Sequence, residues 1–136
     1  MKRISLAMAA ALTCLLVAAV GTAGAMPTEG IVNTSCNTTS KNVIGNKVSI
    51  RVAGKNVDPS QMQFAECKIV KKVANKMLSL RIEKPKAFEG FRCTPSVLTG
   101  GEGTVEPQKV KYGCLFRGAD TATEIRLTFT VTYNTD

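Results

Sequence analysis

Apolar and polar residues alternate along several segments of this chain. The longest such segment runs over residues 125–133, where apolar side chains at every odd position are separated by arginine and threonine. Successive side chains of a strand point to opposite faces, so a period of two predicts a half-buried β-strand. The same pattern predicts strands over residues 47–53, 78–82 and 110–116, and Phe91 and Cys93 share one parity after Gly90.

Turn-forming residues separate these segments. Asp58-Pro59-Ser60, the stretch from Thr94 to Gly103 and Gly118-Ala119-Asp120 are rich in glycine, proline and aspartate. Such residues supply the fixed or positive φ angles that turns require. Turns at this spacing predict an all-β domain of antiparallel strands, arranged as a sandwich or a barrel.

The segment over residues 69–82 has two interpretations. Its apolar residues between Ile69 and Met77 are spaced as on one side of a short helix, with the lysines opposite. They also fit a β-hairpin that turns at Asn75-Lys76, with strands over residues 62–73 and 77–82. We favour the hairpin, because Leu78, Leu80 and Ile82 alternate with polar residues.

The first 25 residues have the order of a secretory signal peptide. Lys2 and Arg3 precede an apolar run from Ile4 to Val20, and Ala23-Gly24-Ala25 follows. The run is shorter than the roughly 20 apolar residues that cross a bilayer, so we expect no membrane span. Residues 1–25 are therefore predicted to be removed, and residues 26–136 to form one secreted or periplasmic domain.

Four cysteines remain after this cleavage, since Cys14 lies within the apolar run. An exported domain of this size with Cys36, Cys67, Cys93 and Cys114 is expected to hold two disulfides. Three pairings are open, of which we favour Cys36 with Cys67 and Cys93 with Cys114. The long spacings and the lack of any C-x-x-C pair argue against a zinc site.

The charge balance favours anionic partners. Removing Lys2 and Arg3 leaves 16 of the 18 basic residues. Together with the 10 acidic residues they give the mature chain a net charge of about +6. Candidate anion-binding residues form a dense cluster: Lys68, Lys71, Lys72 and Lys76. Protection of a strand edge by lysine is the alternative role. No nucleic-acid partner is expected, because the seven aromatic residues are too few for a stacking platform.

The residue types argue against an enzyme. The chain has no histidine, so neither a Ser-His-Asp triad nor a histidine-rich metal site can form. Glu83 with Glu89, or Glu102 with Glu106, are possible carboxylate pairs, although we interpret them as solvated surface. The loop Gly100-Gly101-Glu102-Gly103 lacks the lysine of a phosphate-binding loop. We predict no catalytic residue, metal or cofactor.

Two glycan acceptor patterns flank Cys36. Asn33-Thr34-Ser35 and Asn37-Thr38-Thr39 both match the sequence that eukaryotic hosts glycosylate. The short signal favours a bacterial source, in which these sites would form an unmodified polar entry loop rich in serine and threonine, and the sequence leaves the source open.

Two segments carry a family resemblance. Residues 47–54 (KVSIRVAG), Cys67, and the stretch from Ser79 to Ile82 leading into Phe88-Glu89-Gly90-Phe91 resemble neocarzinostatin-type apoproteins. The resemblance implies an immunoglobulin-like sandwich of about seven strands with two disulfides. This chain departs from the family at Cys36 and Cys93 and in its basic charge, so no ligand residues are carried over.

These features predict an exported, disulfide-stabilised binding module that recognises a protein or an anionic surface molecule. One alternative is an inhibitor of an extracellular enzyme, and another is a carrier of a small apolar ligand. The inhibitor would use a contact loop beside Cys93, whose candidate residues are Thr94, Pro95, Gly100, Gly101, Glu102 and Gly103.

Overall fold

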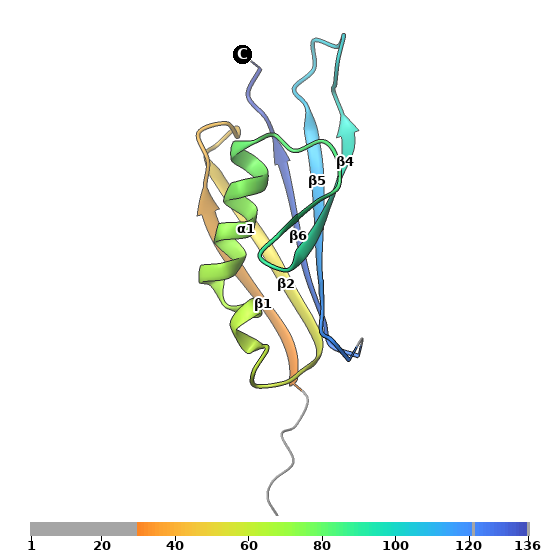
Figure 1. Ribbon diagram of the computed structural model, residues 1–136. Helices are drawn as coiled ribbons and strands as arrows, with labels where there is room; N and C mark the ends of the chain where they lie inside the picture. The colour runs from red at the N-terminus through yellow and green to blue at the C-terminus, as the bar shows by residue number, and fades with distance from the viewer. Residues whose placement is uncertain (1–29, 121, 136) are drawn as a thin grey trace, which may run out of the picture.

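A single antiparallel sheet with one helix across it forms the body of the protein. The computed structural model describes residues 30–120 and 122–135. Its elements are β1 (Gly30–Thr39), β2 (Lys47–Val57), the 3₁₀ turn η1 (Met62–Ala65), α1 (Cys67–Ser79), β3 (Lys86–Phe88), β4 (Phe91–Thr99), β5 (Lys109–Arg117) and β6 (Glu124–Thr132). The strand order is β1-β2-β6-β5-β4-β3. Helix α1 lies across the face of β1 and β2 (Figure 1).

The alternation of side chains builds one buried face. In β6, Ile125, Leu127, Phe129 and Val131 are buried, and in β2 the even positions from Val48 to Gly54 are buried. The strands predicted over residues 47–53, 110–116 and 125–133 are confirmed: the first extends four residues further, the second is one residue longer at each end, and the third is shifted by one residue. Each strand therefore has one covered face and one polar face, as expected of an antiparallel sheet.

The segment after Cys67 is a helix, so the prediction of a hairpin over residues 62–82 is wrong. The buried residues Val70, Val73, Ala74, Met77 and Leu78 follow the i, i+3, i+4, i+7 pattern of a helix face. Because lysines occupy the opposite side, this face packs on the sheet while the ammonium groups stay in water. Residues 78–82 alternate but do not form a strand, because Leu78 lies in the last turn of the helix and Leu80 lies in the exposed connection after it.

Arg81 ends the helix without a glycine. Its φ of 42° is left-handed. The amide of Ile82 donates to the Met77 carbonyl at 3.2 Å, and the amide of Arg81 donates to the Leu78 carbonyl at 3.3 Å. These two bonds form a Schellman motif, in which glycine usually occupies the position of Arg81. The Arg81 guanidinium lies 5.3 Å from the centroid of the Tyr133 ring.

Aromatic residues fill the space between the sheet and the segments that cover it. The Phe64 ring of η1 stacks on Phe116 at 4.2 Å between centroids, and Tyr112 stacks on Phe129 at 5.0 Å. The hydroxyls of Tyr112 and Tyr133 lie 2.6 Å apart in the interior. Burial raises the pKa of both phenols above the usual value of 10.0.

Both favoured disulfide pairings are confirmed. Cys36 of β1 bonds to Cys67, the first residue of α1, and so ties the helix to the edge of the sheet. Cys93 and Cys114 face each other directly in the β4–β5 ladder. One bond therefore joins two layers, and the other joins two neighbouring strands.

The described residues form one six-stranded sheet rather than the two sheets of the predicted sandwich. The layer that a second sheet would fill is occupied by α1 and η1, because residues 67–79 carry an apolar stripe of helical period. The mostly β, antiparallel character of the prediction holds. Over residues 30–120 and 122–135, no helix has the length and apolar character to cross a bilayer. The predicted signal peptide lies outside these residues.

Candidate binding face

The face of the sheet opposite α1 is uncovered in the described part of the chain. We call it the outer face, and it consists of the exposed or half-exposed alternate positions of β1, β2, β6, β5 and β4. Its hydroxyl and amide residues are Asn33, Ser35, Asn37, Thr39, Ser49, Thr94, Ser96, Thr128, Thr130 and Thr132. Polar side chains explain why this face needs no covering layer.

Half of the described basic residues gather on the outer face. They are Lys47, Arg51, Lys55, Arg92, Lys109, Lys111, Arg117 and Arg126. The only carboxylate among the described outer-face positions is Glu124, whose Oε1 lies 3.2 Å from a guanidinium nitrogen of Arg126. The face therefore carries a strong excess of positive charge, which attracts polyanions.

Strand pairing sets the spacing of these charges. Arg92, Leu115 and Arg126 lie opposite one another across β4, β5 and β6. Two strand separations place the Cα atoms of the two arginines roughly 10 Å apart. Arg51 lies on β2 opposite Thr128, diagonally next to Arg126. The hydrogen-bonded sheet therefore fixes the backbone positions of these cations relative to one another.

A hollow of about 620 Å³ lies beside Arg51, where β2 and β6 separate. Their ladder extends from Lys55 to Arg51 on β2, and in the described residues no ladder pair joins the preceding part of β2 to β6. Besides Arg51 and the largely buried Phe129, only residues with hydroxyl or amide side chains line this hollow: Asn33, Thr34, Ser35, Ser49, Thr128 and Thr130. Such groups donate and accept hydrogen bonds in the way that sugar hydroxyls require.

All aromatic side chains lie away from the outer face. The five phenylalanines and two tyrosines of the chain occupy the α1 side of the sheet or the segments that cover it. The outer face therefore offers no aromatic platform on which bases could stack. Recognition here depends on charge and hydrogen bonds.

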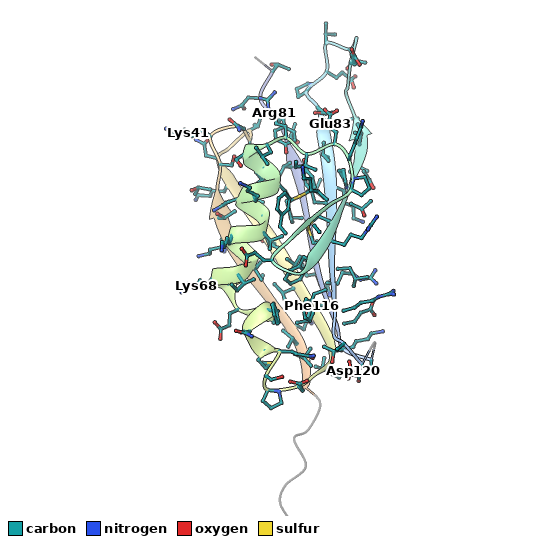
Figure 2. The ribbon with its side chains drawn as sticks, viewed as in Figure 1. Lys41, Lys68, Arg81, Glu83, Phe116 and Asp120 are labelled. Atoms are coloured by element: carbon teal, nitrogen blue, oxygen red, sulfur yellow. A yellow bond between two sulfur atoms is a disulfide. The ribbon has the colours of Figure 1, made fainter. Side chains whose placement is uncertain are left out.

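The predicted lysine cluster lies on the other side of the molecule. Lys68, Lys71, Lys72 and Lys76 are exposed on α1, and Figure 2 shows Lys68 on the flank of the helix. Lys72 forms an ion pair with Glu89 at 2.6 Å. The four lysines do share one helical side, although Glu89 neutralises part of their charge. The protein thus presents two separate basic surfaces.

The predicted contact loop is mostly the end of a strand. Thr94 and Pro95 belong to β4, and residues 100–108 form the turn of a hairpin that projects from one end of the sheet (Figure 1). Gly100, Gly101 and Gly103 have φ angles of 71°, 146° and 85°, which residues with a side chain rarely adopt. Their role in binding stays a prediction.

Three carboxylates line a hollow below this hairpin. Glu83, Glu102 and Glu106 line a hollow of about 610 Å³ together with Arg81 and Tyr133. Figure 2 shows Arg81 and Glu83 at the same end of the molecule. Among the described residues no group of acidic or cysteine side chains is arranged to hold a metal ion. Glu89 lies elsewhere, against Lys72.

The outer face was not predicted as a site. Its cations occur singly along the sequence, separated by apolar residues, so no segment is as dense as residues 68–76. The signal that was present is the basic or hydroxyl character of the polar positions in 47–55, 109–117 and 124–132. A single sheet places all of these positions on one surface, whereas a sandwich divides them between two.

No protein-family model, curated protein or solved structure matches this chain. The resemblance to neocarzinostatin-type apoproteins therefore stays a prediction, and the function is argued from the geometry of the site.

Proposed function

We propose that this protein is an exported binding module whose outer face holds an anionic polysaccharide. The observation that carries the proposal is the excess of cations on the outer face over the single carboxylate of Glu124. An extended polymer with repeated carboxylate or sulfate groups matches a flat lattice of cations better than a small anion does. Hydroxyls around Arg51 bind the sugar ring oxygens and hydroxyls.

Export is part of the same proposal. Two disulfides are typical of proteins that mature outside the reducing cytosol. The predicted signal peptide supports either secretion or a periplasmic location, where anionic surface polysaccharides are present. After removal of Lys2 and Arg3 the mature chain still has a net charge of about +6.

Heparin, a sulfated polysaccharide, is the probe that tests this proposal. The sheet variant combines Arg51→Gln, Arg92→Gln and Lys111→Gln, all on the outer face. We expect its affinity for heparin to fall by about 100-fold, since each lost contact is worth roughly 1 kcal/mol. The slope of log K against log salt should become shallower by about 2 to 3. Isothermal titration at several salt concentrations gives both values.

A variant with the same loss of charge provides the control. Lys68→Gln, Lys71→Gln and Lys76→Gln remove three cations from α1 and leave the outer face unchanged. We expect its affinity to change by less than about threefold. Equal losses for the two variants would mean that heparin senses only net charge, and a larger loss for the helix variant would move the site to α1.

A second candidate function is inhibition of an extracellular enzyme by the β4–β5 hairpin. Exposed apolar side chains favour it, since Val105 is 99% exposed and Val97 and Leu98 are about half exposed. Such side chains on a projecting hairpin are suited to an enzyme cleft. Val105→Glu should abolish inhibition in a panel of extracellular hydrolases without changing heparin affinity. If no enzyme in the panel is inhibited by the unmodified protein, this candidate fails.

A further inference from the structure

Strand β1 is a free edge of the sheet. It has ten residues, and its only strand neighbour in the described chain is β2. In an edge strand, alternate residues direct their backbone N–H and C=O groups away from the sheet. These groups can form a ladder with a further strand.

The two edges of the sheet differ in their protection. Strand β3 is three residues long, contains Lys86 and follows Pro85, and short, charged edges resist unwanted pairing. Strand β1 has the sequence GIVNTSCNTT, with no charged residue and no proline. One register shift, between Gly30 and Val32, interrupts its pairing with β2 near the start. The remainder is a regular, unprotected edge.

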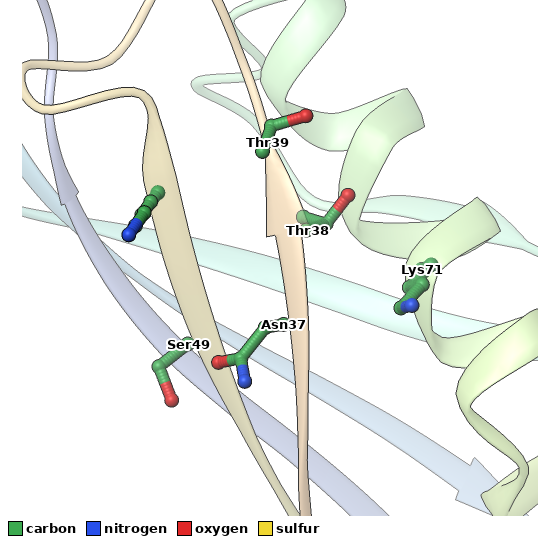
Figure 3. Close-up of a pocket in the computed structure, with 6 residues that line it drawn as sticks. Asn37, Thr38, Thr39, Ser49 and Lys71 are labelled. Atoms are coloured by element: carbon green, nitrogen blue, oxygen red, sulfur yellow. The ribbon is translucent and has the colours of Figure 1, made fainter.

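A hollow of about 730 Å³ lies along this edge. It is lined by residues of β1, β2 and α1: Asn37, Thr38, Thr39, Lys47, Ser49 and Lys71. Figure 3 shows β1 between Lys71, which comes from α1, and Ser49, which comes from β2. A strand added here would direct alternate side chains towards Lys71 on one face and towards Lys47 on the other. None of the lining residues is acidic.

The walls of the hollow are fixed before any partner arrives. The Cys36–Cys67 disulfide joins β1 to the start of α1, and Thr38 Oγ1 donates to Asn75 Oδ1 at 2.7 Å. These two links attach α1 to β1 on either side of Lys71 in the sequence, so the position of Lys71 on the helix is fixed relative to the edge. A partner therefore meets a preformed edge, which lowers the entropic cost of binding.

We propose that the free edge of β1 receives an extended acidic segment of a partner protein, which joins the sheet as an additional strand. Backbone hydrogen bonds supply the pairing, and the two flanking lysines select carboxylates on both faces of the added strand. This site adjoins the polysaccharide site and shares Lys47 with it, but the β1 backbone and Lys71 belong to the edge site alone.

A second copy of the chain fits this edge less well. Antiparallel pairing of β1 with β1 would follow a two-fold axis perpendicular to the sheet and place both α1 helices on the same side. Lys71 and its neighbouring lysines from the two copies would then face each other, and like charges at a pairing interface oppose it. Charge complementarity therefore favours the acidic segment.

Hydrogen exchange with a synthetic peptide tests this proposal. The probe is a ten-residue peptide in which pairs of glutamates alternate with pairs of threonines, so that carboxylates lie on both faces of the added strand. The protein is made in a bacterial host so that Asn37 carries no glycan. We expect saturating peptide to slow exchange at alternate amides of β1. Lys71→Glu should weaken binding by about tenfold or more, while the control Lys68→Glu, outside the hollow, should change it by less than about twofold.

Four results would overturn the proposal. They are an absence of protection in β1 at saturating peptide, equal binding of a lysine–threonine peptide, equal effects of the two charge reversals, and concentration-dependent dimerisation that protects β1 without peptide. Heparin affinity is measured on the same samples. If Lys71→Glu weakens peptide binding and leaves heparin affinity unchanged, the two proposals can be judged independently of each other.

Discussion

Gly54 is a buried position of β2 where the lack of a side chain is required. A Cβ atom there would lie 2.7 Å from Val57 Cγ2 and 3.1 Å from Val32 Cβ. Val57 is itself buried and β-branched, so it has little freedom to move. Gly113, in β5, differs from Gly54 because a Cβ atom there would meet nothing within 4 Å.

Gly54→Ala is therefore expected to lower the free energy of unfolding by about 1 to 3 kcal/mol, as overpacking does. Gly113→Ala should leave it unchanged or raise it by up to about 1 kcal/mol, because alanine is less flexible in the unfolded chain. Urea unfolding followed by circular dichroism measures both values. Equal effects of the two substitutions would contradict the packing of Val32 and Val57 against Gly54.

The tyrosine pair predicts a limit of stability at high pH. Burial raises the pKa of Tyr112 and Tyr133 above 10.0, so the folded state holds both phenols neutral while the unfolded chain ionises them near pH 10. The stabilisation is complete below about pH 10 and is lost as the pH rises further, by up to about 1.4 kcal/mol per pH unit for each phenol.

Tyr133→Phe removes one of these two titrating groups. Tyr112 then keeps its bond to the Ile82 carbonyl, which it donates at 3.2 Å. The decline in unfolding free energy between about pH 10 and pH 11 should be roughly half as steep in this variant. Urea unfolding across this range measures the slopes, and identical slopes would show that Tyr133 ionises freely in the folded protein.

Strands could be predicted where apolar and polar side chains alternate clearly. The helix was wrongly predicted as a hairpin, because its segment fits both a helical and a strand period. Residues 125–133 alternate over nine positions, which only a strand explains. Residues 69–82 carry helical spacing followed by a short alternation, and no glycine marks the end of the helix because Arg81 adopts the left-handed conformation. Packing against β1 and β2 decided in favour of the helix.

The two disulfides should contribute similarly to stability but differently to local order. Replacing Cys36 and Cys67 by alanine should lower the free energy of unfolding by about 3 to 4 kcal/mol, and so should replacing Cys93 and Cys114. Only the first pair attaches α1 to the sheet, so only its loss should speed hydrogen exchange in α1. The second pair leaves the β4–β5 ladder in place on both sides.

Mass spectrometry of exchanging backbone amides resolves this difference. Faster exchange in α1 for both double variants would show that the helix depends on the whole core instead of on the Cys36–Cys67 bond.

At the scale of the whole molecule, one covered face and one open face define the protein. Residues 33–39 were expected to form a polar loop, and they belong to strand β1 instead. The favoured pairing of the cysteines was correct, and the polar half of β2, β5 and β6 could be read from the sequence. The surface that these polar halves form could not, because strand order and the number of sheets depend on contacts between segments far apart in the chain. Arg92 and Arg126 share a row across β5 although 34 residues separate them in the sequence.

The most direct test of the outer face is a map of where heparin binds. Titration of methyl-labelled protein with a heparin oligosaccharide should shift the methyl signals of Thr128 and Thr130, which lie on the outer face beside Arg51. The methyl signals of Thr38, next to α1, and of buried Leu127 should stay in place. Shifts confined to Thr38 and the residues of α1, with none at Thr128 or Thr130, would contradict binding at the outer face.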